Sequence, residues 1–289
     1  MLGLRFPQAR HVNNIIGSVA MDGVDERYLN SSFFGGSYQF PTTTQPVGFT
    51  GWFYPTTLTA GVNYTIASRW FPDVATGGLN SRGVRIELTD VITPGSHKLV
   101  YWFQTTILSA MIVRTATTIA TNQWYHFGVT RDGVDDGSAH AGDTRLGQKI
   151  WLNGEHETTL QTETTLGRMG TITTPQFCIG ARQTNDAGTT FSHHFAGRFA
   201  QLLFFNHFLM PEEIAWLWNG GKGRDARVSN TNNGGLFYFV DNSNFLGSVP
   251  MWARNFGGAD ALGAVSVMVP QNKEEADIQF QDRPPLAPQ

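Results

Sequence analysis

The sequence of 289 residues contains very little cysteine and very little charge. A single cysteine, Cys178, excludes an internal disulfide framework and fits folding in a reducing compartment. Charged residues make up only 15% of the chain, the formal net charge is −3, and Lys and Arg never cluster. Because binding to a phosphate backbone needs clustered positive charge, we expect no nucleic acid partner.

Long apolar runs are also missing. The most apolar stretch, residues 200–210, is interrupted by Asn206 and His207, and it is shorter than the roughly 18 residues that a spanning helix needs. The opening "MLGLRFPQARHVNN" contains arginines and a proline in place of the apolar centre of a secretory signal peptide. We therefore expect a protein that is made in the cytoplasm and does not insert into a membrane.

Alternating patterns between turn signals dominate the rest of the chain. In "GVRIELT" at 83–89, three apolar side chains alternate with arginine, glutamate and threonine, which predicts a half-buried strand. Similar strands are predicted at 48–54, 64–70, 98–104, 123–130, 149–152, 176–182, 198–205 and 236–240. Tight turns are predicted at Asp22-Gly23, Asp132-Gly133 and Asn153-Gly154. Many short strands joined in this way predict an all-β fold of two packed antiparallel sheets.

One short helix is predicted near residues 211–219. Pro211 suits the first helical position, and the two glutamates that follow it complement the positive end of the helix dipole. Gly220 and Gly221 can supply the left-handed conformation that ends a helix. The helix directly follows an apolar strand, so we expect it to form part of the scaffold.

Five motifs follow one another along the chain: "VAMDGVDERYL" from 19, "FTGWFYPT" from 49, "QWYHFGVTRDG" from 123, "KIWLNGE" from 149 and "FAGRFAQLLFFNHFLMPEEIAWLWNGGKGRD" from 195. In this order they resemble the concanavalin A-like sandwich of the laminin-G-like and pentraxin-like domains. The resemblance covers residues 18–225 and implies a two-sheet jelly roll in which the helix caps the late strands.

The resemblance divides the chain into three parts. Residues 1–17 form an N-terminal arm, 18–269 the sandwich, and 270–289 a polar C-terminal tail that ends in "RPPLAPQ". The arm and the tail have no evident part in closing the core. We therefore expect these two segments to attach the protein to its partners.

Binding members of the superfamily often use calcium, which needs several converging oxygen ligands. Weak candidate ligands are Asp132, Asp135, Asp136 and Asp143. None of them fits an EF-hand loop, and Ala200-Gln201 replaces the Asp-Glu pair that the resemblance would place there. His193 and His194 are adjacent and would point to opposite faces of a strand, so they cannot bind one metal together. We expect no cofactor, and no calcium bound more tightly than the millimolar range.

Enzymatic motifs are incomplete. Laminarinase-like relatives of the sandwich use an E-x-D-x-x-E strand, and the nearest string here is "EEADIQF". Its Glu275 and Asp277 alternate correctly, but Gln279 stands where an acid is needed. The nucleophile elbow G-x-S-x-G is absent, and Cys178 lies in an apolar strand. We therefore expect a protein that is not an enzyme.

Residues at a strand end are the candidates for ligand contact. The candidates are Trp70, Phe71, Asp73, Asn80 and, in a later loop, Asp186, with core packing as the alternative for Trp70.

The segment "WNGGKGRD" at 218–225 looks like the end of sandwiches in bacteriophage structural proteins. It implies a non-enzymatic, homo-oligomeric virion protein that decorates a capsid or tail, touches other virion proteins through its terminal segments and contacts glycans. The alternatives are a carbohydrate-binding lectin module, calcium-dependent or not, and a degenerate glycan hydrolase.

Overall fold

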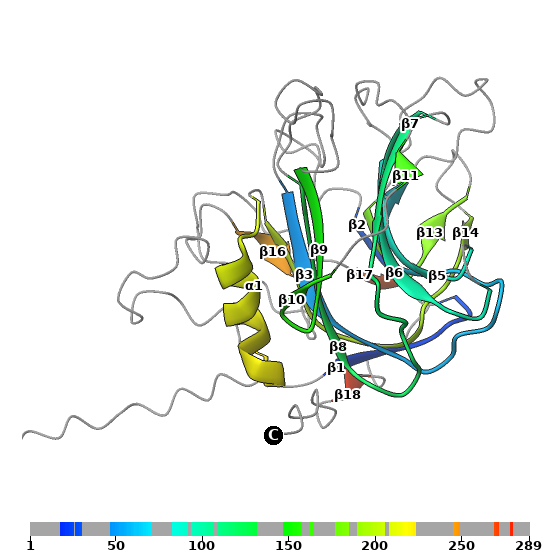
Figure 1. Cartoon of the computed structure of the whole chain (residues 1–289). Helices are drawn as coiled ribbons and strands as arrows, with labels where there is room; N and C mark the ends of the chain where they lie inside the picture. Colours follow the sequence, from blue (N-terminus) through cyan, green and yellow to red (C-terminus); the bar gives the residue numbers. More distant parts are fainter. Residues whose placement is uncertain are drawn as a thin grey trace, which may run out of the picture.

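The computed structural model describes residues 18–25, 27–30, 47–70, 83–91, 94–106, 109–131, 147–157, 162–163, 177–184, 190–205, 208–223, 245–248, 269–271 and 278–279. In this part the chain forms two antiparallel sheets of eight strands each, a two-stranded hairpin and one short α-helix (Figure 1). The predicted all-β fold with two packed sheets is confirmed.

Sheet A contains the first and the last strands of the described chain. Its order from edge to edge is β10 (Glu155–His156), β9 (Gln148–Leu152), β8 (Tyr125–Arg131), β3 (Val47–Pro55), β15 (Ala196–Phe205), β1 (Ser18–Asp22) and β18 (Ile278–Gln279). An additional strand, β16 (Phe245–Ser248), pairs with the later part of β15.

Sheet B faces sheet A across the core. Its order is β11 (Thr162–Glu163), β7 (Ser109–Arg114), β6 (Lys98–Thr106), β5 (Gly83–Thr89), β4 (Tyr64–Trp70), β12 (Phe177–Ile179), β2 (Arg27–Asn30) and β17 (Val269–Gln271). The small hairpin consists of β13 (Arg182–Gln183) and β14 (Phe191–Ser192). Strands β17 and β18 lie almost entirely within the predicted tail, 270–289, and they pair with β2 and β1. The expectation that the tail has no part in the fold is therefore wrong for these two strands, because their backbone groups extend the two sheets.

The core lies between the two sheets and is built from the inward side of each alternating strand. Phe53, Phe127 and Ile66 are completely buried there, and so are Leu88 and Phe103 from sheet B. Burial of each such side chain stabilises the fold by about 1.5–3 kcal/mol. The alternation predicted for 83–89 is confirmed, because its three apolar side chains belong to this core.

The predicted strands at 64–70 and 83–89 are found with the same bounds. The predicted strand at 176–182 is divided into β12 and β13, because Gly180 adopts a φ of +83° that a continuous strand does not allow. The prediction for 236–240 lies outside the described residues.

The predicted turn at Asn153 and Gly154 is confirmed, with φ values of +52° and +84°. Glycine is also required there by packing, since a Cβ at Gly154 would lie 2.4 Å from a ring carbon of Trp218. The turn at Asp22-Gly23 has the expected left-handed glycine as well, with a φ of +84°. The third predicted turn, Asp132-Gly133, lies outside the described residues.

The helix α1 (Pro211–Trp218) covers the outer face of sheet A (Figure 1). It begins as predicted with Pro211, and the carboxylate of Glu213 accepts the free N–H of Met210 at 2.7 Å. Its left-handed end begins at Asn219, with a φ of +50°, and continues through the predicted glycines, Gly220 and Gly221, with φ values of +61° and +83°. The space for the helix comes from Gly128, whose Cβ would lie 2.3 Å from Cδ1 of Ile214. No helix in the described part is long and apolar enough to cross a membrane.

Candidate functional site

The outer face of sheet B carries polar and aromatic side chains on adjacent strands. Arg85 of β5 lies directly opposite Ser68 of β4 and Trp102 of β6. Glu87, two residues further along β5, lies opposite Thr65 on β4. Directly opposed residues of antiparallel strands project from the same face. The register therefore brings these five side chains together on one surface.

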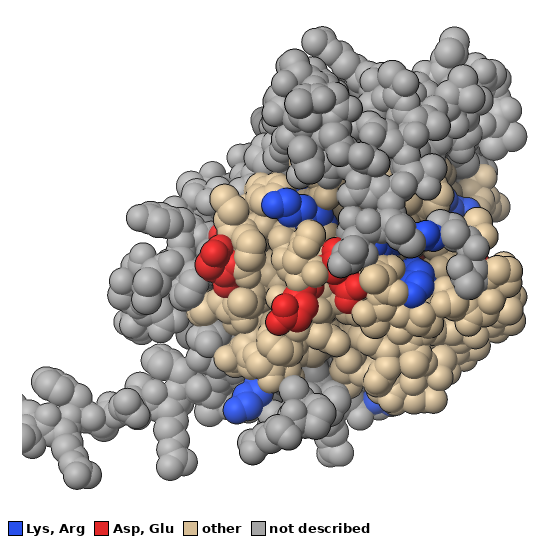
Figure 2. All heavy atoms as spheres, in the orientation of Figure 1, with Lys and Arg blue, Asp and Glu red and all other residues tan. Residues whose placement is uncertain are grey.

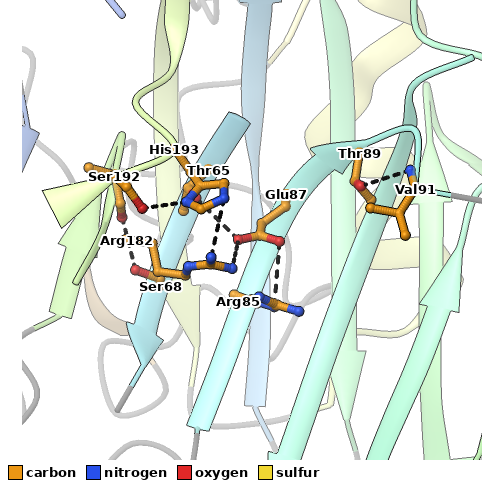
Figure 3. A network of polar contacts seen from close by, with 10 residues as sticks. Thr65, Ser68, Arg85, Glu87, Thr89, Val91, Arg182, Ser192 and His193 are labelled. Carbon is orange, nitrogen blue, oxygen red and sulfur yellow. Dashed lines mark hydrogen bonds and ion pairs between the residues drawn. The ribbon is translucent and has the colours of Figure 1, made fainter. Parts of the chain in front are cut away.

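The carboxylate of Glu87 is the centre of this surface (Figure 3). Its Oε1 lies 3.0 Å from Nη1 of Arg182 and accepts the hydroxyl of Thr65 at 3.3 Å. Its Oε2 lies 3.4 Å from Nε of Arg85. The side chain is only 1% exposed, and such burial of a carboxylate requires paired charges and hydrogen bonds. Two guanidinium groups therefore pair with this buried carboxylate, one at each oxygen.

His193 joins the small hairpin to the same network (Figure 3). Nη2 of Arg182 donates to its Nε2 at 3.2 Å, and its backbone carbonyl accepts the N–H of Thr65 at 2.8 Å. Burial, with the Arg182 charge as the second cause, lowers the pKa of His193 to about 4. The imidazole is therefore neutral near pH 7, and it accepts from Arg182 because it carries its proton on the other nitrogen.

Arg85 is clamped between two indole rings. Its Cζ lies 4.3 Å from the ring centroid of Trp70 and 4.1 Å from that of Trp102. Together with the ion pair to Glu87, this stacking fixes the orientation of the guanidinium group. The Trp102 side chain as a whole is only half-buried, but its indole nitrogen is buried and has no hydrogen-bond partner among the described residues.

Exposure on this face increases from β4 toward β7. Thr65 and Ser68 are 0% and 1% exposed on β4, the strand that the β13–β14 hairpin contacts. Trp102 on β6 and its neighbours on β7, Ile112 and Arg114, are partly exposed. We name the surface formed by Arg85, Trp102, Ile112 and Arg114 the Trp102 strip. It offers an aromatic ring beside fixed nitrogen donors, which suits a ligand with both apolar faces and hydroxyl groups.

Comparison with known proteins identifies the family. The family model described as the concanavalin A-like lectin/glucanases superfamily matches residues 35–215. The chain belongs to this superfamily. No protein of curated function matched the sequence.

The structure of this chain is similar to several solved structures, including the following three. A putative carbohydrate-binding protein from Bacteroides ovatus ATCC 8483 has 13% identity and a TM-score of 0.50, with 89% of this chain and 60% of that chain covered. A heptameric SAP-like pentraxin from Limulus polyphemus has 16% identity and a TM-score of 0.45, with coverage of 75% and 88%. The CBM40 of a Ruminococcus gnavus IT-sialidase, bound to α2,3 sialyllactose, has 12% identity and a TM-score of 0.45, with coverage of 68% and 94%. At these identities the likeness concerns the fold.

Within the superfamily sandwich, one predicted ligand contact can be placed. Trp70 ends β4, is 5% exposed and packs against Arg85 as part of the charge network. The other predicted contacts, Phe71, Asp73, Asn80 and Asp186, lie outside the described residues, as do Asp132, Asp135, Asp136 and Asp143. Those predictions therefore stay predictions. In the described ranges, no three His, Cys, Asp or Glu side chains are grouped so that they could hold a metal.

The remaining predictions concern Cys178, the replaced acid at Ala200 and the incomplete hydrolase motif. Cys178 is fully buried in β12, so its predicted burial is confirmed, and burial raises the pKa of its thiol to about 12. Ala200, in place of the family's acid, is completely buried against Trp52, where a small apolar residue fits. Gln279 lies in β18, and Glu275 and Asp277 are outside the described residues.

The placement of the two histidines differs from the prediction. His193 does not continue a strand: it follows β14 with a left-handed φ of +58°. Its ring turns to Arg182 because the backbone reverses at this point.

Sequence reasoning also assigned Glu87 and Arg85 simply to the polar side of a strand. Their network requires Arg182, which lies 95 positions from Glu87, so no local pattern could reveal it.

Proposed function

We propose that this protein is a non-catalytic carbohydrate-binding module that contacts its glycan with the Trp102 strip. The observation that carries the proposal is the stack of Arg85 between Trp70 and Trp102 beside a partly exposed surface. Membership of a superfamily of lectins and glucanases supports a sugar ligand. A similar fold occurs in the Bacteroides ovatus protein, which is itself described as a putative carbohydrate-binding protein.

The chemistry of a sugar matches the two kinds of group on this strip. Sugar rings have C–H faces that pack on an aromatic ring, and hydroxyl groups that need hydrogen-bond partners when water is displaced. Trp102 supplies the ring, and the partly exposed guanidinium groups of Arg85 and Arg114 supply hydrogen-bond donors. Arg85 is already fixed by Glu87 and the two indoles, so binding orders little that was free before.

A catalytic role for Glu87 is not supported by its surroundings. Glycoside hydrolysis uses two carboxyl groups, of which one donates a proton and the other acts as nucleophile or base. Both oxygens of Glu87 are engaged, one by Arg182 and Thr65 and the other by Arg85. Because the Glu87 side chain is also only 1% exposed, neither oxygen is free to meet a substrate, and we infer that the carboxylate positions Arg85 for binding.

The test is a glycan array, followed by calorimetric titration of the best ligand. We expect Trp102→Ala to weaken binding at least tenfold, because it removes the aromatic face. Trp124→Ala is the matched control, since Trp124 is also a half-buried tryptophan but packs on sheet A. The proposal fails if no glycan binds, or if the two substitutions weaken binding equally.

A second candidate is a structural role on a bacteriophage virion, as a capsid decoration or tail accessory protein. The specific observation that favours it is the segment "WNGGKGRD" at 218–225, with its resemblance to phage structural proteins. In this role the N- and C-terminal segments would bind other virion proteins, and the glycan-binding strip would face outward.

The virion role is tested by mass spectrometry of purified particles from the native source, which should contain this chain. Deleting residues 1–15, or separately 280–289, should abolish incorporation while the melting temperature stays nearly unchanged, since both deletions spare the paired strands β1 and β18. Normal incorporation of both truncated chains would exclude attachment through the termini.

A further inference from the structure

Positive charge gathers on the outer face of sheet B, although the chain as a whole has a formal net charge of −3. Three cations project outward from its strands, because the residue next to each of them belongs to the core: Arg85, Lys98 and Arg114. Arg182 of the small hairpin adds a fourth. In Figure 2, most of the red atoms lie over α1 and the edge of sheet A, whereas blue atoms lie over sheet B.

Two described carboxylates lie near these four cations. Glu87 pairs with Arg182 at 3.0 Å and with Arg85 at 3.4 Å. Glu157 lies against the loop that follows β7, where it accepts two backbone N–H groups at 2.9 Å and 3.1 Å. Four cations against two carboxylates leave an excess of positive charge among the described residues of this face.

Arg114 on β7 is the cation that lacks a counter-charge. It lies directly opposite Val100 and is partly exposed, and it forms no ion pair with either described carboxylate. Lys98, by comparison, is already engaged by uncharged acceptors, since its Nζ donates to a backbone carbonyl and, at 2.8 Å, to the hydroxyl of Thr118. The guanidinium of Arg114 is therefore the group on this face best placed to pair with an anion from outside.

The second face of the Trp102 ring turns toward Arg114. Arg85 comes from β5, on one side of β6, and covers the first face with its Cζ 4.1 Å from the ring centroid. The second face therefore turns toward β7, where Ile112 lies directly opposite Trp102 and Arg114 lies diagonally. Diagonal neighbours on adjacent strands are roughly 7–8 Å apart. A sugar ring stacked on Trp102 would thus have its substituents within reach of the long Arg114 side chain.

We propose that the glycan bound by the Trp102 strip carries an anionic group, a carboxylate or a sulfate, which pairs with Arg114. The inference rests on the proposed function and narrows its ligand to acidic sugars. A guanidinium group matches such oxyanions with two parallel hydrogen bonds. A neutral sugar leaves the excess charge of this face uncompensated, whereas an acidic sugar neutralises it and is attracted from a distance.

The first experiment is a glycan array that carries carboxylate-bearing and sulfated glycans beside uncharged counterparts of the same backbone. We expect the acidic member of a pair to bind most strongly, and the pairs show whether a carboxylate or a sulfate is preferred. Calorimetric titration of the best pair follows at low salt and at about 1 M salt, where the Debye length is about 3 Å. Salt should weaken binding of the acidic glycan and have little effect on its counterpart.

The second experiment uses variants of the strip. Arg114→Gln should weaken binding of the acidic glycan at least about tenfold, since it removes a charge-assisted hydrogen bond, and should hardly affect the uncharged counterpart. Arg114→Lys keeps the charge without the planar fork and should lose less. Arg198→Gln is the matched control, because Arg198 is a half-buried arginine on the outer face of sheet A, opposite Tyr54.

The inference is overturned if uncharged counterparts bind as strongly as acidic glycans, or if Arg114→Gln and Arg198→Gln weaken binding equally. Polyglutamate binding as strongly as the best acidic glycan would also overturn it, because it would show a general response to negative charge. Binding of uncharged glycans alone, still lost in Trp102→Ala, would overturn this inference and leave the proposed function standing. Binding of no glycan at all would instead overturn the proposed function.

Discussion

The two outer faces of this sandwich are covered by different kinds of side chain. Sheet A is closed by α1, with Ile214 and Leu217 of the helix packed on Trp151 in an apolar cluster. Sheet B instead buries Glu87 among arginines and leaves Trp102 partly exposed. Both sheets contribute side chains to the core, and they differ in what covers their outer faces. The closed face serves stability, and the polar face is where recognition of a ligand can occur.

A histidine with a pKa lowered mainly by burial lies on each side of the sandwich. His126 of sheet A lies under Trp52 with ring centroids 5.0 Å apart, and burial lowers its pKa to about 3. Its Nε2 contacts the hydroxyl of Thr50 at 3.0 Å, which is the type of neutral bond that an apolar surrounding requires. His193, which follows β14 of the small hairpin beside sheet B, is less buried, and the Arg182 charge beside it is the second cause of its lowered pKa.

The largest effect is expected from Ile214→Ala on the closed face. The substitution leaves a cavity between α1 and sheet A, and we expect it to reduce the free energy of unfolding by about 3 kcal/mol. Glycan affinity should stay unchanged because the Trp102 strip is on the other sheet. Chemical denaturation and calorimetric titration measure the two quantities. A loss of affinity in the folded variant would show that the two faces are coupled.

A smaller loss of stability is expected from Glu87→Gln on the polar face. The change leaves Arg182 and Arg85 without their carboxylate, and we expect it to cost about 2 kcal/mol, since both arginine side chains keep some exposure. In contrast to Ile214→Ala, it should also weaken glycan binding, because Arg85 loses the group that orients it. Unchanged affinity would mean that Glu87 has a purely structural role.

The third prediction concerns the loss of stability in acid, which is the smallest of the three effects near neutral pH. A histidine whose folded pKa lies below the unfolded value of about 6.5 takes up a proton on unfolding, so stability falls as the pH drops below that value. The loss of stability due to each histidine should end near its folded pKa, which is about 4 for His193 and about 3 for His126. Each fully coupled group contributes up to about 1.4 kcal/mol per pH unit, and partly exposed His193 contributes less.

Denaturation curves between pH 7 and pH 4 measure this slope in the wild type and in two variants. His126→Gln should flatten the slope more than His193→Gln, since His126 is the more deeply buried. Equal slopes in all three proteins would contradict the assignment of acid sensitivity to these histidines.

Sequence reasoning predicts the scaffold well because its signals are local. The alternation of Val84, Ile86 and Leu88 defines a strand by itself, and Gly154 defines a turn whatever surrounds it. The candidate site depends instead on cross-strand register and on contacts between distant segments. Nothing near Glu87 in the sequence indicates Arg182, and a glutamate beside an arginine is usually a solvated pair.

The central claim is that the glycan binds the outer face of sheet B. Hydrogen–deuterium exchange, measured with and without the glycan found on the array, tests it most directly because it maps the contact along the whole chain. We predict slower exchange in β6 and β7, Lys98–Thr106 and Ser109–Arg114, and no change in α1, Pro211–Trp218. Protection confined to α1 or to other elements of sheet A, with none in β6 and β7, would contradict the account.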